Sequence, residues 1–354
     1  MTPIPPAVSD PTIAALLAFH CPLEEEVSPE SDQLLDRTLA WAKHHRLGTT
    51  DEQTAMFAMT GATFAAHMYP HARGETAQAF SDYDAWGWAA NDRVGSATRT
   101  CDIVADLGRW ERIMHSPASW SHSADPLDTA LSDAFTRLRT HLTPVQWERF
   151  TTGQGQWLYS MGWEVALRER GTPLGVNDYL AMRIGAGGCY SAAAYLDGTE
   201  NTNLSEHHWA NPTLRATVEA GMLTALLDND RYSYLREHRL AVRKHNLFDA
   251  LRTEHPHYTF DQAATAAIAL RDRIMTLYLR LRKQQLKNAP HDVRRYLTGV
   301  DRVLSGNITF AATAVRYLLP DLPHTVTRTS QPTDSTTGAP DLPTIAWWWN
   351  QLTP

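Results

Sequence analysis

The sequence has little of what marks secreted, membrane-spanning or nucleic-acid-binding proteins. Its 354 residues include three cysteines, Cys21, Cys101 and Cys189, whose spacing fits no metal site, so we expect free thiols in a reducing cytoplasm. No run approaches the ~18 apolar residues of a membrane-spanning helix, so no membrane insertion is expected, and residues 1–10 lack the apolar core of a signal peptide. The net charge of −7, without a basic tail or stripe, argues against nucleic acid as a partner.

Charged residues are also scarce, at 20% of the chain, whereas 43% are hydrophobic, a composition that favours a large buried core. The 12 tryptophans fit either such a core or an aromatic-lined pocket, and their number favours neither. Strand-like alternation is rare, and apolar residues recur instead at helical spacing. We therefore predict a single-domain, all-α helical bundle. Its helices are expected at Ser31–His45, Thr54–His67, Phe80–Ala97, Cys101–Met114, Pro126–Leu142, Pro144–Arg170, Val176–Leu196, Pro212–His238, Leu247–Glu254, Phe260–Lys287 and His291–Leu319.

The C-terminal end of the chain differs in composition from the rest. Residues 324–343 are rich in threonine, serine and proline and are predicted to be flexible, because they bury too little apolar area to offset the entropy lost on ordering. Three consecutive tryptophans follow within residues 345–352, and this segment can dock on the body. We divide the chain into an N-terminal extension (1–20), a helical domain (21–320) and a flexible tail that ends in the Trp-rich segment (321–354).

The most informative pattern lies near the end of the predicted helix 212–238. Asn229, Ser233 and Glu237 follow one another at intervals of four residues, so they drift by only ~80° around a helix and project from one face. An amide oxygen, a hydroxyl and a carboxylate are the hard ligands that suit Mg²⁺. A solvated polar face is the plainer interpretation. However, an apolar run precedes these residues, and polar groups at such depth need a compensating role.

The run from Asn229 to Glu237, N-D-x-x-S-x-x-x-E, resembles the second metal motif of bacterial class I terpene synthases. The resemblance implies an all-helical fold around a central hydrophobic cavity. It also implies that Asn229, Ser233 and Glu237 bind one of up to three Mg²⁺ ions that assemble with the diphosphate of a prenyl substrate. Arg236 then matches a basic position that contacts this diphosphate.

A second match precedes this motif. Arg183 lies 46 residues before Asn229, the spacing of the family's diphosphate-sensing arginine, and a planar guanidinium pairs well with phosphate oxygens. Gly185, Gly187 and Gly188 follow and predict a break in the helix. In the family such a break aims a backbone carbonyl at the substrate, and Gly187 matches that position. In the family an aspartate often links the arginine to the carbonyl position, and the corresponding residue here is Ala186.

A third match lies near the end of the predicted helical domain. Arg316-Tyr317 resembles the family's C-terminal Arg-Tyr pair, which reaches the diphosphate when the site closes. With shorter matches in the N-terminal half, the resemblance covers residues 22–319. It is also compatible with a homodimer.

The family's aspartate-rich motif is degenerate in this sequence. Asn91 stands where the first aspartate is expected, Asp92 matches the second, and no carboxylate follows at the next positions. Fewer anionic ligands weaken metal affinity. Either Asn91 and Asp92 together ligate metal in a reduced site, or only the ion at Asn229, Ser233 and Glu237 is held firmly before the substrate arrives. Asp84, two turns earlier on the same helix, is a further alternative ligand.

The resemblance implies that Mg²⁺ and Arg183, Arg236 and Arg316 neutralise the leaving diphosphate, and that aromatic rings in a dry pocket stabilise the carbocation. The candidate ring residues, each of which can instead be plain core, are Phe64, Trp86, Trp88, Trp157, Tyr190 and Phe310. Small residues suggest a roomy cavity, which favours geranylgeranyl diphosphate over farnesyl diphosphate. They are Ala89, Ala90, Gly185, Gly187, Gly188, Ala192, Ala193 and Ala194.

Three other functions remain open at this point. The degenerate first motif is compatible with a non-catalytic isoprenoid-binding protein of the same fold. A chain-elongating prenyltransferase needs two DDxxD-type motifs, and the sequence has neither. A helical interaction scaffold does not require the spaced polar residues.

Overall fold

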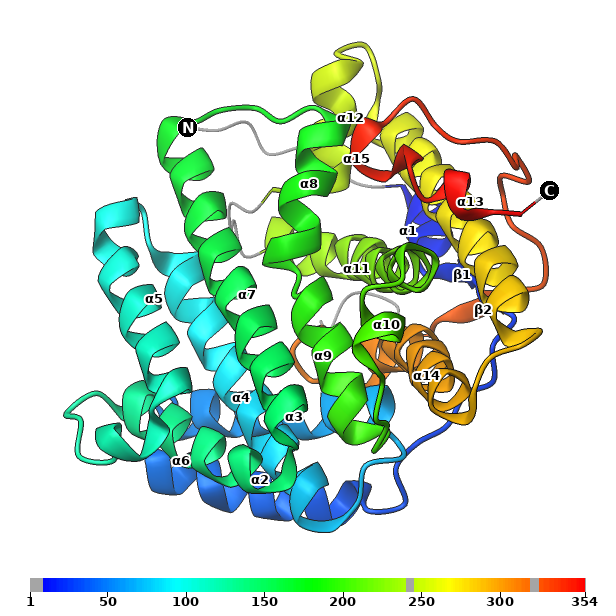
Figure 1. Cartoon of the computed structure of the whole chain (residues 1–354). Coiled ribbons are helices and arrows are strands. Elements are labelled where there is room, and N and C mark those ends of the chain that lie inside the picture. The colour runs from blue at the N-terminus through cyan, green and yellow to red at the C-terminus, as the bar shows by residue number, and fades with distance from the viewer. Residues whose placement is uncertain (1–8, 240–244, 319–324, 354) are drawn as a thin grey trace.

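The computed structural model describes residues 9–239, 245–318 and 325–353, which form helices and one short pair of parallel strands (Figure 1). The first half contains α1 (Asp10–Leu16), β1 (Ala18–His20), α2 (Ser31–His45), α3 (Asp51–Met68), α4 (Gly74–Ser96), α5 (Thr100–His115), the 3₁₀ turn η1 (Pro117–Trp120), α6 (Pro126–His141) and α7 (Pro144–Arg170). The second half contains α8 (Val176–Ala186), α9 (Cys189–Thr199), α10 (Glu206–Trp209), α11 (Pro212–Arg239), α12 (Leu247–Glu254), α13 (Phe260–Leu286), α14 (His291–Thr313), β2 (Thr327–Thr329), α15 (Pro343–Ala346) and the 3₁₀ turn η2 (Trp349–Gln351).

The all-α prediction is confirmed, and the predicted bounds of α2, α7 and α12 agree with the structure. Two predicted helices differ. The helix expected over 176–196 is broken into α8 and α9, because Gly188 takes the left-handed conformation with φ of +79°. The last helix ends at Thr313, because Ala314 adopts an extended conformation that redirects the chain. Nothing in the described ranges is both long and apolar enough to form a membrane-crossing helix.

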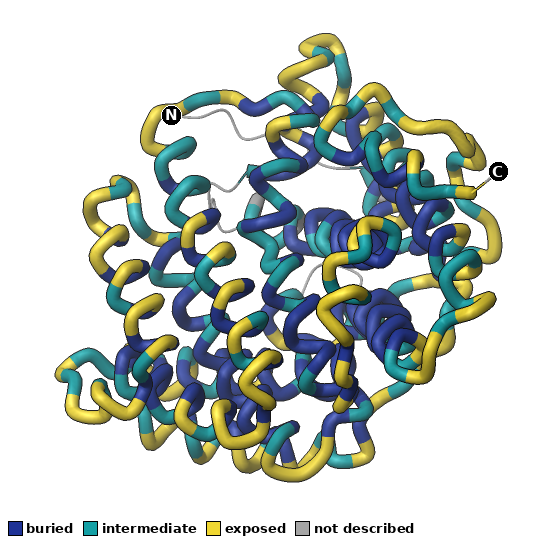
Figure 2. Tube along the Cα trace, in the orientation of Figure 1, coloured by how far each residue is buried: buried dark blue, intermediate teal, exposed yellow. Residues whose placement is uncertain are grey.

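The long helices form a ring around a central space. α4 packs on α3 and α7, α7 packs on α8 and α9, these two pack on α11, α11 packs on α14, and α14 returns to α3. Figure 2 shows that buried positions face the inside of this ring, whereas exposed positions lie on its outer turns. Local sequence determines where the helices of the ring begin and end. For example, α7 begins with a capping box between Thr143 and Gln146 and ends at Gly171, which is in the left-handed conformation.

The N-terminal segment is integrated into the body. Arg231 of α11, almost fully buried, donates hydrogen bonds to the carbonyls of Ala15 and Ala18, and its guanidinium lies 4.1 Å from the centre of the Phe19 ring. A buried guanidinium needs such acceptors to offset its desolvation. Residues 9–20, treated as an extension from the sequence, therefore cover the helix that carries the candidate metal ligands.

The described part of the tail, residues 325–353, also differs from the flexible segment expected. β2 pairs in parallel with β1, and the backbone and hydroxyl of Thr333 donate to Asp272 of α13. Trp348 is fully buried, and its Nε1 donates to Glu219 of α11 at 2.9 Å. Burial of Trp348 agrees with the docking considered from the sequence, whereas composition missed the order at Thr333 because its partner lies on a distant helix.

We expect Trp348→Ala to lower the free energy of unfolding by about 3–5 kcal/mol, since it deletes a buried aromatic side chain. Urea unfolding measures the change. Trp347→Ala is the matched control, because Trp347 is only partly buried, and its effect should be clearly smaller. Equal stability of Trp348→Ala and the parent chain would contradict a docked tail.

Candidate active site

The helical ring encloses a cavity of about 240 Å³, comparable in scale to small-molecule pockets in proteins. Its walls come from α3, α4, α7, α8, α9, α11 and α14, together with the loop after α14. Most of the residues predicted from the sequence line it. They are Phe64, Trp88, Asn91, Trp157, Arg183, Gly187, Asn229, Ser233, Arg236, Glu237, Phe310, Arg316 and Tyr317.

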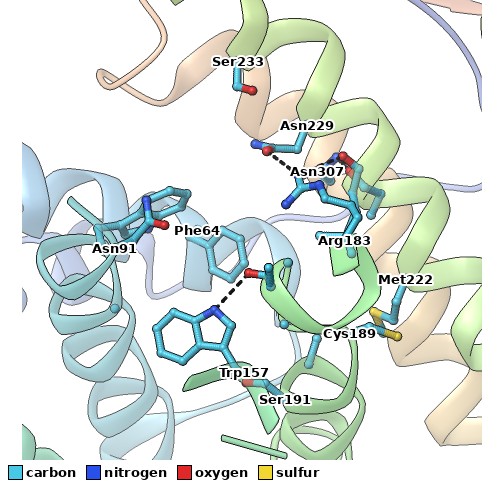
Figure 3. Close-up of a pocket in the computed structure, with 18 of the residues that line it drawn as sticks. Phe64, Asn91, Trp157, Arg183, Cys189, Ser191, Met222, Asn229, Ser233 and Asn307 are labelled. Carbon is cyan, nitrogen blue, oxygen red and sulfur yellow. Dashed lines mark hydrogen bonds between the residues drawn. The ribbon is translucent and has the colours of Figure 1, made fainter. Parts of the chain in front are cut away.

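One wall is the polar end of α11. Asn229, Ser233 and Glu237 all line the cavity, so the face predicted from their spacing points inward rather than into solvent. Figure 3 shows Asn229 and Ser233 one turn apart on α11, with Asn91 of α4 facing the same space from the opposite side. The arrangement places three oxygen-bearing side chains along one edge of the cavity.

Arg183 of α8 forms hydrogen bonds with this wall. Its Nη2 donates to Asn229 Oδ1 at 2.8 Å, and its Nε donates to Asp230 Oδ1 at 2.9 Å (Figure 3). Tyr179 donates its hydroxyl to the other oxygen of Asp230. Burial works against the guanidinium charge, but the combined attraction of Asp230 and its anionic neighbours raises the pKa of Arg183. Arg183 is therefore a cation in the wall, held against the amide of Asn229.

Two more cations gather beside this wall. Arg316 donates through both terminal nitrogens to the carboxylate of Asp92, and its guanidinium lies 5.0 Å from the centre of the Trp88 ring. Burial, with repulsion from Arg316 next, lowers the pKa of Arg236. Repulsion between Arg316 and Arg236 thus adds to the effect of burial. A bound anion would relieve it.

The break between α8 and α9 lies next to Arg183. Trp157 donates its Nε1 to the carbonyl of Ala186 at 3.2 Å, which holds the last turn of α8 (Figure 3). A Cβ atom on Gly187 would lie 2.5 Å from the side chain of Leu226 on α11. Only glycine therefore lets the break approach α11 this closely. The carbonyl role that the resemblance assigns to Gly187 stays a prediction.

An aromatic wall joins α3, α4 and α14. The rings of Phe64 and Phe310 meet edge to face at 5.3 Å, and Trp88 stacks on Phe310 at 6.1 Å. Tyr317 continues the wall, with its ring 6.5 Å from that of Trp88. Tyr317 also accepts a hydrogen bond from Asn229 Nδ2 at 3.2 Å, which links the aromatic wall to the polar one.

Comparison with known proteins places this arrangement in a family. The model of terpene synthase family 2, C-terminal metal binding, matches residues 82–276, more than half of the chain. The diterpene cyclase DtcycB of a Streptomyces species is 39% identical over 95% of this chain and 98% of its own. The chain belongs to the terpene synthase family. It is a class I terpene cyclase, a lyase that acts on prenyl diphosphates.

Two further relatives agree with this assignment. The (+)-T-muurolol synthase of Streptomyces clavuligerus, which cyclises (2E,6E)-farnesyl diphosphate, is 29% identical over 94% of this chain and 82% of its own. A crystal structure of the SVS_A2 protein from ancestral sequence reconstruction superposes with a TM-score of 0.82 at 28% identity, covering 94% of this chain and 98% of that one. The matched family region includes both the α4 motif and the α11 motif of this terpene synthase.

The donor set of this terpene synthase fits a divalent metal, whose use the family model implies. Asn229, Ser233 and Glu237 offer oxygen atoms of the kind Mg²⁺ prefers, but only one of them is a carboxylate. No three His, Cys, Asp or Glu side chains gather as a metal site within the described residues. The α11 edge itself therefore contributes a single carboxylate, that of Glu237, to a metal site.

The role of Asp92 as a metal ligand stays a prediction. Asp92 is absent from the cavity lining, and its carboxylate is engaged by Arg316. One step along a helix turns a side chain by 100°, so Asn91 faces the cavity while Asp92 lies to its side. Asp84 does line the cavity, but it lies about 10 Å from Asn91 along α4, which separates it from this edge of the site.

Trp86 is also misassigned as a pocket residue. It is fully buried in the core, donates Nε1 to the carbonyl of Leu127 at 2.9 Å and stacks on the ring of Tyr83. It lies two positions before Trp88, a step of about 200° that places the two tryptophans on nearly opposite faces of α4.

Tyr190 lies on the outer side of α9, along a separate groove that includes Arg215 and Trp347. Burial raises the pKa of its hydroxyl to about 12. Of the small residues predicted to line the cavity, some do and others do not. Those that do line it are Gly187, Gly188 and Ala192. Those absent from the lining are Ala89, Ala90, Gly185, Ala193 and Ala194.

Sequence reasoning missed the end of the cavity farthest along α4 from Asn91. We call this end the polar floor. It consists of Tyr69, Tyr83, Asp84, Gln154, Ser191 and Tyr195. The signal was present: Asp84, Gly87, Trp88 and Asn91 recur at i, i+3, i+4 and i+7 and all line the cavity. The sequence alone, however, suggests Asp84 as an alternative metal ligand rather than as part of a separate end of the cavity.

Gly187→Ala should destabilise this terpene synthase by about 1–3 kcal/mol, because the added methyl group collides with Leu226. Thermal unfolding measures the change. Gly87→Ala is the matched control: Gly87 also lines the cavity, but a Cβ there meets only Trp157, at 4.0 Å. Equal melting temperatures for the two variants would contradict the close approach of the break to α11.

Proposed function

We propose that this terpene synthase ionises a prenyl diphosphate with Mg²⁺, with geranylgeranyl diphosphate favoured over farnesyl diphosphate, and cyclises the carbocation to a polycyclic terpene. The observation that carries this proposal is the meeting of three arginines with the Asn229, Ser233 and Glu237 edge at an aromatic cavity. The relative named as a diterpene cyclase, at 39% identity, supports the longer substrate over the farnesyl substrate of the relative at 29%.

The cations provide the binding site for the leaving group. Arg183, Arg236 and Arg316 line the same cavity, and a diphosphate bound there would balance the repulsion between Arg236 and Arg316. Their planar guanidinium groups can each pair with two phosphate oxygens. Binding energy at the diphosphate thus orients the hydrocarbon toward the aromatic wall.

Arg183 couples diphosphate binding to the metal ligands. Its Nη2 contacts Asn229 Oδ1, the amide oxygen that would hold the metal. When Arg183 turns toward a diphosphate, that oxygen is released from the guanidinium. Mg²⁺ bound by Asn229, Ser233 and Glu237 supplies Lewis-acid neutralisation of the leaving group. Up to three ions, as in the resemblance, would share this role, with Asn91 as a neutral oxygen donor on the opposite wall.

The aromatic wall protects and stabilises the cation. Phe64, Trp88 and Phe310 present ring faces and edges inside a helical ring whose interior is buried. A desolvated ring face contributes about 2 kcal/mol of cation–π attraction. Exclusion of water prevents early quenching of the cation.

We expect purified protein incubated with Mg²⁺ and geranylgeranyl diphosphate to release diphosphate and yield a cyclic C20 product, detected by mass spectrometry. Glu237→Gln should lower this rate by about 10²–10³-fold, as loss of a key electrostatic group does. Glu148→Gln, at an exposed position on α7, should leave it unchanged. Binding of the substrate without any diphosphate release would instead favour a non-catalytic isoprenoid-binding protein. A higher kcat/KM for farnesyl diphosphate would overturn the chain-length preference.

Asp92→Ala separates the two hypotheses for the degenerate motif. The Arg316 contact favours an unliganded Asp92, so the Mg²⁺ concentration for half-maximal rate should stay within about threefold of the parent value. The rate should fall at saturating Mg²⁺, because Arg316 loses its partner. A rise of about tenfold or more in the Mg²⁺ requirement, as expected for a lost carboxylate ligand, would assign Asp92 to the metal site.

A further inference from the structure

Asp84 is a buried acid inside a cavity that is otherwise suited to hydrocarbon. Only 8% of Asp84 is exposed, and it lines the cavity at the polar floor. Its Oδ1 accepts a hydrogen bond from the Tyr195 hydroxyl at 2.9 Å. Its buried Oδ2 has no hydrogen-bond partner among the described residues. An unsatisfied buried oxygen costs about 1–3 kcal/mol, so its presence calls for a function.

The other residues of the polar floor contact one another. Tyr83 donates its hydroxyl to Gln154 Oε1 at 2.6 Å, and Gln154 Nε2 donates to Ser191 Oγ at 2.6 Å. Tyr69 stacks on Tyr195 with ring centres 5.1 Å apart. These contacts fix the floor around Asp84. None of these contacts provides a hydrogen-bond partner for Asp84 Oδ2.

The surroundings favour the protonated form of this carboxyl. Burial raises the pKa of Asp84 well above its usual range, and the neighbouring Asp82 adds to the shift, while the Tyr195 hydrogen bond opposes it. Because Oδ1 accepts the Tyr195 hydrogen bond, the proton resides on Oδ2. A neutral acid is also compatible with the first carbocation, since it adds no anion to the cavity before the proton is donated.

The depth of Asp84 matches the hydrocarbon rather than the diphosphate. Seven residues separate Asp84 from Asn91, which is about 10 Å along α4. A prenyl chain whose diphosphate lies among Arg183, Arg236 and Arg316 extends its later double bonds toward this end of the cavity. A carboxylic acid can do one thing to such an alkene: it can donate a proton to it.

We propose that Asp84 is a catalytic acid–base residue that protonates a neutral cyclic alkene formed partway through the cyclisation. The inference rests on the proposed function, since the alkene arises from the prenyl diphosphate. It adds a second cation-forming step to the initial ionisation.

The step balances within the reaction. After ionisation, the first cyclic cation loses a proton to the released diphosphate and becomes a neutral alkene. The Oδ2–H bond of Asp84 then breaks, the π electrons of the alkene form a new C–H bond, and a second cation remains beside the Asp84 carboxylate. That carboxylate finally removes a proton from a carbon next to the last cation, which forms the product double bond and restores the acid. No oxidant, reductant or other co-reactant is needed.

Reaction in D₂O tests the proposal in the parent enzyme. Between turnovers the open cavity lets the Asp84 proton exchange with solvent, so the donated atom becomes deuterium. We expect the product to carry one carbon-bound deuterium per molecule, seen as a mass increase of one unit. Product formation without this label overturns the proposal and leaves the proposed function intact. Absence of any diphosphate release overturns the function itself.

Asp84→Asn provides the second test, because it keeps the shape and the oxygen that accepts from Tyr195 but removes the acidic proton. Total diphosphate release should change by less than about tenfold, while the labelled product falls by about 10²-fold or more and a neutral early alkene accumulates. A merely structural Asp84 would lower both rates together. Retention of the labelled product in Asp84→Asn would contradict the proposal.

Asp82→Asn is the matched control. Asp82 is an equally buried acid on the same helix, and burial raises its pKa to about 6, but it pairs with Gln78 and Arg137 and lies outside the cavity lining. We expect Asp82→Asn to lower stability while the ratio of labelled product to released diphosphate stays at the parent value. A change in that ratio would show that the label does not report on Asp84 specifically.

Discussion

The site depends on the contacts that the guanidinium of Arg183 makes with α11. This guanidinium comes from α8, reaches the amide of Asn229 and the carboxylate of Asp230 on α11, and is itself buried in the wall between them. A charge at this depth is tolerated only because Asp230 balances it, and Tyr179 fixes the orientation of Asp230. The helix break at Gly187 then brings α8 close enough to α11 for this reach.

The cavity changes character from one end to the other. Cations and oxygen ligands occupy the end near Asn229, aromatic rings form the middle, and the polar floor around Asp84 closes the far end. Each zone suits one part of a prenyl diphosphate reaction: departure of the anion, protection of the cation, and proton transfer to or from the hydrocarbon. Catalysis of this kind depends on groups positioned before the reaction begins, so the rigid packing of the ring contributes as much as the individual residues.

The sequence allowed the elements and part of the site to be predicted. Helical spacing alone placed Asn229, Ser233 and Glu237 on one face, and the resemblance added Arg183 and Arg316. Which face of a helix points inward depends on packing between distant segments, and a one-residue step rotates a side chain by 100°. Trp86 was misplaced for this reason. Docking of the Trp-rich segment was anticipated, but the order of the preceding residues was missed because Thr333 finds its partner on α13, far away in sequence.

A crystal structure with Mn²⁺ and inorganic diphosphate tests the central claim most directly, since anomalous scattering locates the ion. The account predicts an ion about 2.1 Å from oxygen atoms of Asn229, Ser233 and Glu237, with Arg183 turned from Asn229 onto the diphosphate. A diphosphate bound while Arg183 still holds Asn229, with the ion elsewhere or missing, would contradict it.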